Sequence, residues 1–191
     1  MGVSTSESPQ KPSWNVLYGI AAAEEGYFTT AQAAEAGYSR PLLAKYIANG
    51  RIERARHGIY RLQHFPPGEH EDLVVIWLWS GQQGIFSHET ALSLHRLSDV
   101  MSAKIHLTVP KDWEHRRLRV PMGVMLHYAD IAHEDKKWMG PVPVSSPKQT
   151  VLDCARAHLS SEFLEQAVQA GIQRGLFTKA IITEIGNLNG Q

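Results

Sequence analysis

Three short segments near the start of the chain carry apolar residues at helical spacing. The pattern predicts helices over residues 14–25, 29–36 and 39–49. Thr29 and Gln32 form a capping box at the start of the second helix. A short Gly-containing turn separates the second helix from the third, which is typical of a helix-turn-helix.

Two short extended segments follow these helices. They predict strands over residues 52–56 and 59–62, and His57-Gly58 between them is a two-residue turn of the hairpin kind. The predicted order is that of a winged helix-turn-helix: two helices, a tight turn, a third helix and a hairpin.

The rest of the chain alternates between helical and extended patterns. Helices are expected over residues 70–80, 87–97, 161–174 and 179–185 and from Ser146 onward, and strands over 84–86, 105–109, 124–128 and 142–144. The fold class predicted is therefore α+β, with an N-terminal winged helix-turn-helix followed by a mixed α/β domain.

A Pro-Pro-Gly segment just after residue 65 interrupts regular structure, and we expect the domain boundary there. We expect a flexible polar tail at residues 1–12, the winged helix at 13–64 and the α/β domain at 65–191.

Charge is distributed unevenly, although 19 basic and 19 acidic residues cancel over the whole chain. The segment 39–61 holds six basic residues and one acid, Glu53, and so carries +5. A basic third helix and wing suit a DNA duplex, whose phosphates attract cations and release counterions on binding.

Eight residues of this segment are candidates for DNA contact. Arg40 and Asn49 are expected to read bases, because Arg pairs with guanine and Asn with adenine. Ser39 is placed for a phosphate, and His57 lies at the tip of the wing. The phosphate-binding cations are Lys45, Arg54, Arg56 and Arg61.

The sequence also leaves two alternatives to DNA binding open. Asp130, Glu134 and Lys136 faintly resemble the carboxylates and lysine of metal-dependent nucleases, but they fall in a polar segment after a predicted strand, where a solvated loop is expected. A winged helix that binds protein instead of DNA is the other alternative. A basic loop, Arg116–Arg119, could extend the DNA face or meet a protein.

Metal and cofactor chemistry is not expected. His88 and His95 lie seven residues apart, whereas two helical zinc ligands are commonly four apart, so a structural role is predicted for both. The single cysteine, Cys154, lies among apolar residues and fits a buried structural thiol in a reducing, cytoplasmic compartment. No apolar run is long enough to span a membrane.

The run GYFTTAQAAEAGYSRPLLAKYIANGRIERARHGIYRL, from Gly26 to Leu62, resembles the N-terminal domain of AbiEi-type antitoxins of bacterial toxin–antitoxin systems. The segments SHETALSLHRLSD, KIHLTVP and VPVSSPKQTVLDCA are similar to that family's second domain. The resemblance implies a non-enzymatic repressor that binds inverted repeats in double-stranded DNA at its own promoter. It also implies that the second domain neutralises a nucleotidyltransferase-like toxin without forming a stable complex.

Overall fold

The computed structural model describes residues 11–189, so the tail predicted at residues 1–12 lies almost wholly outside it. The chain divides into two compact units, one reaching Trp79 and one beginning at Ser80. No described helix is both long enough and apolar enough to cross a membrane. The class is α+β, as predicted.

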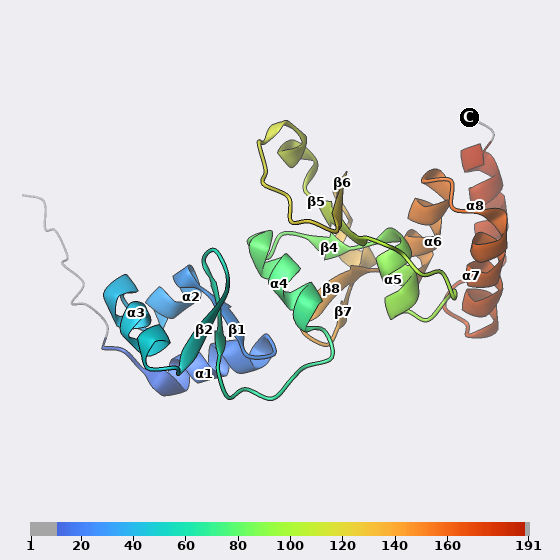
Figure 1. The fold of residues 1–191 in the computed structure, drawn as a ribbon. Coiled ribbons are helices and arrows are strands. Elements are labelled where there is room, and N and C mark those ends of the chain that lie inside the picture. Colours follow the sequence, from blue (N-terminus) through green and yellow to red (C-terminus); the bar gives the residue numbers. More distant parts are fainter. Residues whose placement is uncertain (1–10, 190–191) are drawn as a thin grey trace, which may run out of the picture. The chain divides into compact units, whose positions relative to one another are not determined.

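The first unit is a winged helix-turn-helix followed by one further helix (Figure 1). Its elements are α1 (Trp14–Ala23), β1 (Tyr27–Thr29), α2 (Thr30–Glu35), α3 (Arg40–Ala48), β2 (Ile52–Arg56), β3 (Ile59–Leu62) and α4 (Glu71–Trp79). The strands form a three-stranded antiparallel sheet in the order β1-β3-β2.

The sequence indicates only a short extended bridge at Tyr27-Phe28, between the first two helices, and the structure makes it strand β1. Tyr27–Thr29 pairs with β3, and Phe28 is fully buried. Its ring joins Leu17, Leu43 and Leu62 in one hydrophobic core. The strand forms because it closes the sheet over this core, and that partner lies too far along the chain for a local pattern to reveal it.

Local capping sets where the two helices of the helix-turn-helix begin. The Thr29 hydroxyl accepts from the Gln32 N–H at 3.2 Å, while the Gln32 side chain accepts from the Thr29 N–H at 2.7 Å. Ser39 caps α3 by accepting from the Leu42 N–H at 3.4 Å. These caps therefore define the residues at which α2 and α3 begin.

Thr29→Ala is expected to lower the free energy of unfolding by about 1 kcal/mol, because the Gln32 N–H at the start of α2 loses the hydroxyl that accepts its hydrogen bond. Thr29→Ser keeps the hydroxyl and should stay close to wild type. Urea unfolding of both variants measures the difference. Equal stability of the two variants would show that the cap contributes nothing.

The division between the units lies after α4, whereas the punctuation near residue 65 placed that helix in the second domain. Two contacts explain the difference. The Glu25 carboxylate accepts from the His70 N–H at 2.9 Å, and the Tyr27 hydroxyl donates to Glu71 at 3.2 Å. The start of α4 is therefore bound to the winged helix, and the Pro-Pro-Gly segment is a connection within one unit.

The second unit holds a five-stranded mixed sheet in the order β6-β5-β4-β8-β7. Its elements are β4 (Ile85–Phe86), α5 (His88–Leu94), β5 (Ile105–Val109), the 3-10 helix η1 (Lys111–His115), β6 (Val124–Tyr128), the 3-10 helix η2 (His133–Asp135), β7 (Lys136–Met139), β8 (Val142–Ser145), α6 (Pro147–Arg156), α7 (Ser161–Gln173) and α8 (Ala180–Asn189). Parallel pairing joins β5 to β6 and β4 to β8.

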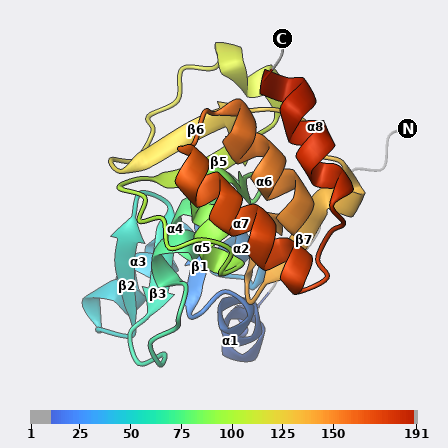
Figure 2. The same ribbon diagram turned by 90° about the vertical axis from the view of Figure 1, so that its right-hand side faces the viewer.

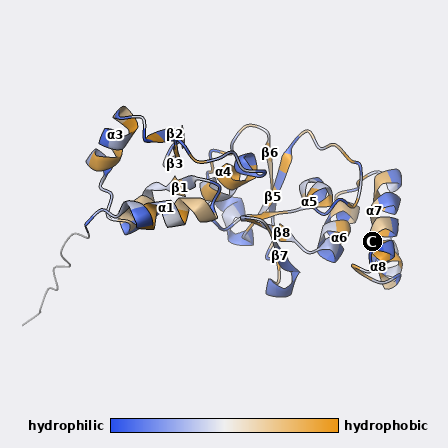
Figure 3. Ribbon diagram, turned by 90° about the horizontal axis from the view of Figure 1, so that it is seen from below, coloured by the Kyte–Doolittle hydropathy of each residue, from blue (hydrophilic) through white to orange (hydrophobic). Residues whose placement is uncertain are grey.

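Helices α5 to α8 gather on one side of this sheet (Figure 2). Their core includes Leu92, Val151, Ala167 and Ile181, all essentially inaccessible to solvent. Helices α7 and α8 carry hydrophobic and hydrophilic residues side by side, as amphipathic helices at a surface do (Figure 3). The sheet and helices thus provide a rigid base for the side chains on β5 and β6.

Candidate functional site

Helix α3 presents a polar, basic surface. Leu43 is buried on its inner face, whereas the side chains of Ser39, Arg40, Lys45 and Asn49 are exposed. Two of these four also have local roles, since Ser39 caps the helix and Asn49 is its C-terminal cap residue. The exposed side chains of α3 are not needed for the core, which leaves them available for contact with a groove.

The wing formed by β2 and β3 has an irregular, charged tip. Residues 53–57 are all exposed, and a bulge between Arg54 and Arg56 interrupts the pairing with β3. The Arg54 guanidinium donates to Nδ1 of His57 at 3.0 Å and to the Arg56 carbonyl at 3.3 Å. The wing therefore carries its cations in a shape set by local hydrogen bonds.

The predicted cations differ in whether an acid neutralises them. The ion pairs found within residues 11–189 leave Arg40, Lys45, Arg54 and Arg56 without an acidic partner. Unneutralised cations keep their full attraction for phosphate.

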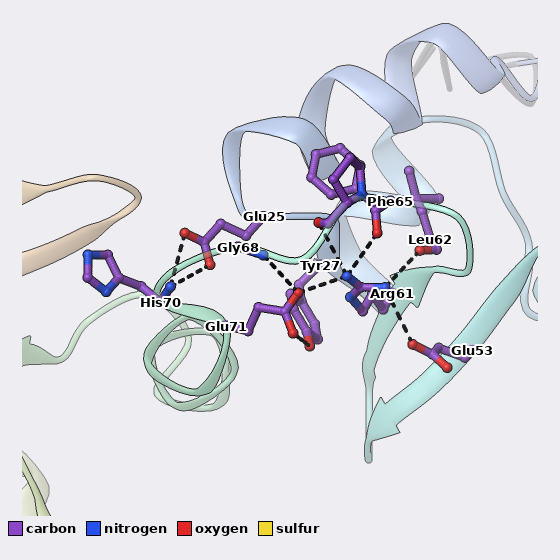
Figure 4. Close-up of polar contacts among 10 residues, drawn as sticks. Glu25, Tyr27, Glu53, Arg61, Leu62, Phe65, Gly68, His70 and Glu71 are labelled. Carbon is purple, nitrogen blue, oxygen red and sulfur yellow. Dashed lines mark hydrogen bonds and ion pairs between the residues drawn. The ribbon is translucent and has the colours of Figure 1, made fainter.

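Arg61 departs from its prediction as a phosphate contact. Its side chain is only 12% exposed, and its guanidinium donates to Glu71 at 2.7 Å and to the Phe65 carbonyl at 3.0 Å (Figure 4). Glu53 lies 3.8 Å away on the other side. A net charge count cannot distinguish such a paired cation from a free one, so Arg61 is a structural residue here.

The ionisation of this pair is mutually supported. Burial would raise the pKa of Glu71, but hydrogen bonds from the Gly68 N–H and from Arg61 outweigh it and hold that pKa below its usual value. Burial would likewise lower the pKa of Arg61, but the contact with Glu71 leaves it raised. Both groups are therefore charged over the physiological range.

A second polar site lies in the second unit, where three histidines converge. His88 begins α5, His106 lies on β5 and His127 on β6. In the parallel register His127 pairs with Thr108, so it faces the same side as His106. One ring nitrogen from each lies within 4.8 Å of the others, and within residues 11–189 this is the group of three that could hold a metal ion.

The three rings are close and electrically neutral at ordinary pH. Burial, followed by repulsion from His127 and His106, lowers the pKa of His88 to about 3. Burial, followed by repulsion from His106, lowers the pKa of His127 to about 4, and burial lowers that of His106. Neutral imidazole is the form that binds metals.

A cavity of about 780 Å³ opens beside two of these histidines. Its lining includes His88, His127, Asp130, Asp153 and Arg156. Burial raises the pKa of Asp153, against hydrogen bonds from Gln149 and Arg156 that lower it. The cavity therefore combines imidazole, carboxylate and guanidinium groups on one wall of the unit.

The nuclease candidates are not assembled into a metal site. Asp130 lines the cavity and accepts from the Lys111 N–H at 3.3 Å, and Glu134 is exposed on η2. Lys136 begins β7, with its ammonium 5.2 Å from the centre of the Trp138 ring. In the part of the chain that the structure describes, Asp130 and Glu134 belong to no group of three close metal-ligand side chains.

The remaining sequence candidates have local roles. Nε2 of His95 is 2.7 Å from the Ser145 carbonyl in a buried hydrogen bond, which fits its predicted structural role. Cys154 is also buried, and burial raises its pKa well above the usual value. In the basic loop, Arg116 pairs with Asp112, while Arg117 and Arg119 are exposed.

The histidine group was missed because its members come from three separate segments. His106 and His127 each alternate with apolar residues on a strand, and only the parallel pairing of β5 with β6 brings them together. The sequence alone does not reveal this strand pairing. A search for metal ligands along one helix, such as His88 and His95, therefore cannot find the group.

Comparison with known proteins agrees with the sequence resemblance in the first unit. Residues 20–63 match the model of a family described as "Transcriptional regulator, AbiEi antitoxin". The match covers the helix-turn-helix and the wing, and it confirms the resemblance over those residues.

The full chain was also compared with curated proteins and solved structures. No curated protein matches it. The crystal structure of the RV2827C protein from Mycobacterium tuberculosis is similar, with 16% sequence identity over 95% of this chain and 83% of that chain and a TM-score of 0.47. At that TM-score the likeness is general, and no assignment rests on it.

Proposed function

We propose that this chain is a sequence-specific DNA-binding repressor that acts as the antitoxin of a toxin–antitoxin system and represses its own operon. The observation that carries the proposal is the exposed basic surface of α3 and the wing, on a segment that matches a family of transcriptional regulators. The proposal assigns no catalytic activity to the chain, and a repressor of this kind would work in the cytoplasm.

Two kinds of contact make up the proposed interface. Arg40 and Asn49 would read guanine and adenine from the two ends of α3 in the major groove. The remaining residues would contact the phosphates of the DNA backbone; they are Ser39, Lys45, Arg54, Arg56 and His57. Arg61 is left out, because its guanidinium is engaged with Glu71.

The bound DNA would be an inverted repeat in the promoter, occupied by two copies of the chain. The functional partner of the second unit would be a nucleotidyltransferase-like toxin from the same operon, acting without a stable complex.

The experiment is binding of the purified full chain to the DNA upstream of its own gene, compared with a scrambled fragment of equal length. We expect about 10³-fold tighter binding to the upstream fragment, and a steep loss of affinity between two salt concentrations. Weak and equal binding to both fragments would show that the chain binds DNA only through non-specific electrostatic attraction. That result would overturn the repressor half of the proposal.

The antitoxin half has its own test. Cells that express the adjacent toxin should survive when the full chain is co-expressed. They should not survive when the co-expressed chain lacks the second unit but keeps the DNA-contact residues of the first. Failure of the full chain to rescue growth would overturn this half and leave the repressor half standing.

A further inference from the structure

We propose that His88, His106 and His127 bind a zinc ion in the second unit. This inference is independent of the DNA-binding function, because all three residues and their neighbours lie beyond Ser80. It rests on the type and spacing of the ligands, on the polar groups behind two of the rings and on the backbone of His88.

The ligand type and number fit zinc. Three imidazoles plus one open position make a common set for a tetrahedral Zn²⁺, and imidazole nitrogen is also accepted by copper and nickel but is a poor ligand for Mg²⁺ or Ca²⁺. Zinc is the assignment because three histidines with one open position form a tetrahedral zinc set, whereas Cu²⁺ and Ni²⁺ favour square-planar or tetragonal sites.

The spacing is close to what the ion needs. Zinc with bonds of about 2.0 Å separates its ligand nitrogens by about 3.3 Å. Nδ1 of His106 and Nε2 of His127 are already 3.0 Å apart in a hydrogen bond, and all three ligand atoms lie within 4.8 Å. The proton shared in that bond would move to the other nitrogen of its ring when zinc binds. Rotation of the His88 ring, now stacked on His127 with centroids 3.6 Å apart, would bring in the third nitrogen.

The outward nitrogens of two of these rings have polar partners. Nδ1 of His88 lies 2.9 Å from the Ser87 hydroxyl oxygen. In the tautomer in which Nδ1–H donates to this oxygen, Nε2 is free to bind the metal. Nε2 of His106 faces the Glu89 carboxylate at 3.9 Å, which leaves Nδ1. Metal-bound histidines characteristically have such a hydroxyl, carbonyl or carboxylate behind them, because it fixes the tautomer and the ring orientation.

Ser87 contacts the His88 ring and does not cap its helix. It occupies the N-cap position of α5, yet its side chain makes no capping hydrogen bond. Its hydroxyl instead accepts from Thr108 at 2.7 Å and contacts His88. These two contacts hold the hydroxyl behind the His88 ring.

The backbone of His88 supports the same conclusion. Its φ is 51°, in the left-handed region that a side-chain-bearing residue adopts at a cost. Strained, buried residues of this kind cluster at functional sites, where the strain positions a side chain. Here the strain turns the first residue of α5 toward the two strands.

The open position of the ion would face the cavity, because His88 and His127 both line it. Water from the cavity would complete the tetrahedron. The ion would therefore be reachable by solvent, by chelators and by added metals, which makes the proposal directly testable.

The experiment uses the full chain purified without a polyhistidine tag, loaded with Zn²⁺ and dialysed. We expect about one zinc per chain by elemental analysis, and intense visible absorption of tetrahedral Co²⁺ when Co²⁺ replaces it. His127→Ala, on the edge strand β6, should weaken Zn²⁺ binding more than about 100-fold, beyond the 10–100-fold loss typical of an outer partner.

The matched control is His133→Ala, an exposed histidine on η2 that should bind Zn²⁺ like wild type. Glu89→Gln should weaken binding by about 10–100-fold while leaving the inner ligands in place, and so it tests the site even if His127→Ala fails to fold. Substoichiometric zinc in the wild type, or unchanged affinity in both His127→Ala and Glu89→Gln, would overturn the proposal.

Discussion

Arg61→Ala is expected to lower the free energy of unfolding of the first unit by about 2–3 kcal/mol, somewhat less than the 3–5 kcal/mol typical of a fully buried pair. The substitution leaves Glu71 partly buried without its cation and leaves the Phe65 carbonyl without a donor. Hydrogen exchange of the amides in β1 and β3, together with urea unfolding, measures the loss.

Arg56→Ala is the matched control, because it removes an arginine from the same hairpin at an exposed position. Its stability should stay within about 0.5 kcal/mol of wild type. Arg61→Lys should recover only part of the loss, because an ammonium cannot reproduce the planar fork that reaches Glu71 and Phe65 together. Equal stability of Arg61→Ala and Arg56→Ala would show that Arg61 is a surface cation after all.

Low pH should remove part of the stabilisation that the Arg61–Glu71 ion pair gives to the first unit. The folded-state pKa of Glu71 is lowered, so its carboxylate stabilises the fold above the unfolded-state pKa, near 4.5, and the stabilisation is lost as pH falls through the folded-state value. The advantage of wild type over Glu71→Gln should therefore be constant at neutral pH and shrink below pH 4.5.

The fate of Arg61 illustrates what the sequence could and could not predict. Local signals were sufficient for the helix-turn-helix, because the Thr29 box, the Ser39 cap and the Gly58 turn act within a few residues. The charge of the segment 39–61 was also correct as a sum. Which cation is paired depends on Glu71, which lies ten residues after Arg61 and on helix α4.

The same limit explains the two other surprises. Strand β1 exists because β3 pairs with it, and α4 belongs to the first unit because Glu25 and Tyr27 hold its start. Punctuation by proline and glycine marks a break in regular structure, but it does not reveal which side the next helix packs on.

In the second unit, sequence patterns identified β5, β6 and most helices but not the site they build. A strand pattern shows which residues alternate, and it does not show which strand lies beside which. His106 and His127 became neighbours only through parallel pairing, and His88 joined them through the turn into α5. A site made by topology is therefore invisible to a search for spaced ligands.

The wing gives the second large prediction. Arg54→Ala combined with Arg56→Ala is expected to weaken binding to the upstream DNA by about 100-fold, taking about 1.5 kcal/mol for each charged hydrogen bond lost. Both cations are exposed and lack an acidic partner within the described residues. The hydrogen bonds of Arg54 stay within the tip of the wing, so the double substitution should leave the core of the first unit intact. Binding isotherms at several salt concentrations measure the change.

The salt dependence separates loss of phosphate contacts from a general change of charge. Two lost contacts should reduce the slope of log affinity against log salt by about 1.8, and weaken scrambled DNA in the same proportion. Lys137→Ala combined with Lys179→Ala removes the same charge from exposed positions of the second unit and should leave the slope unchanged. If the control pair flattened the slope as much as the wing pair, the wing would hold no phosphate, and the proposed interface would reduce to α3 alone.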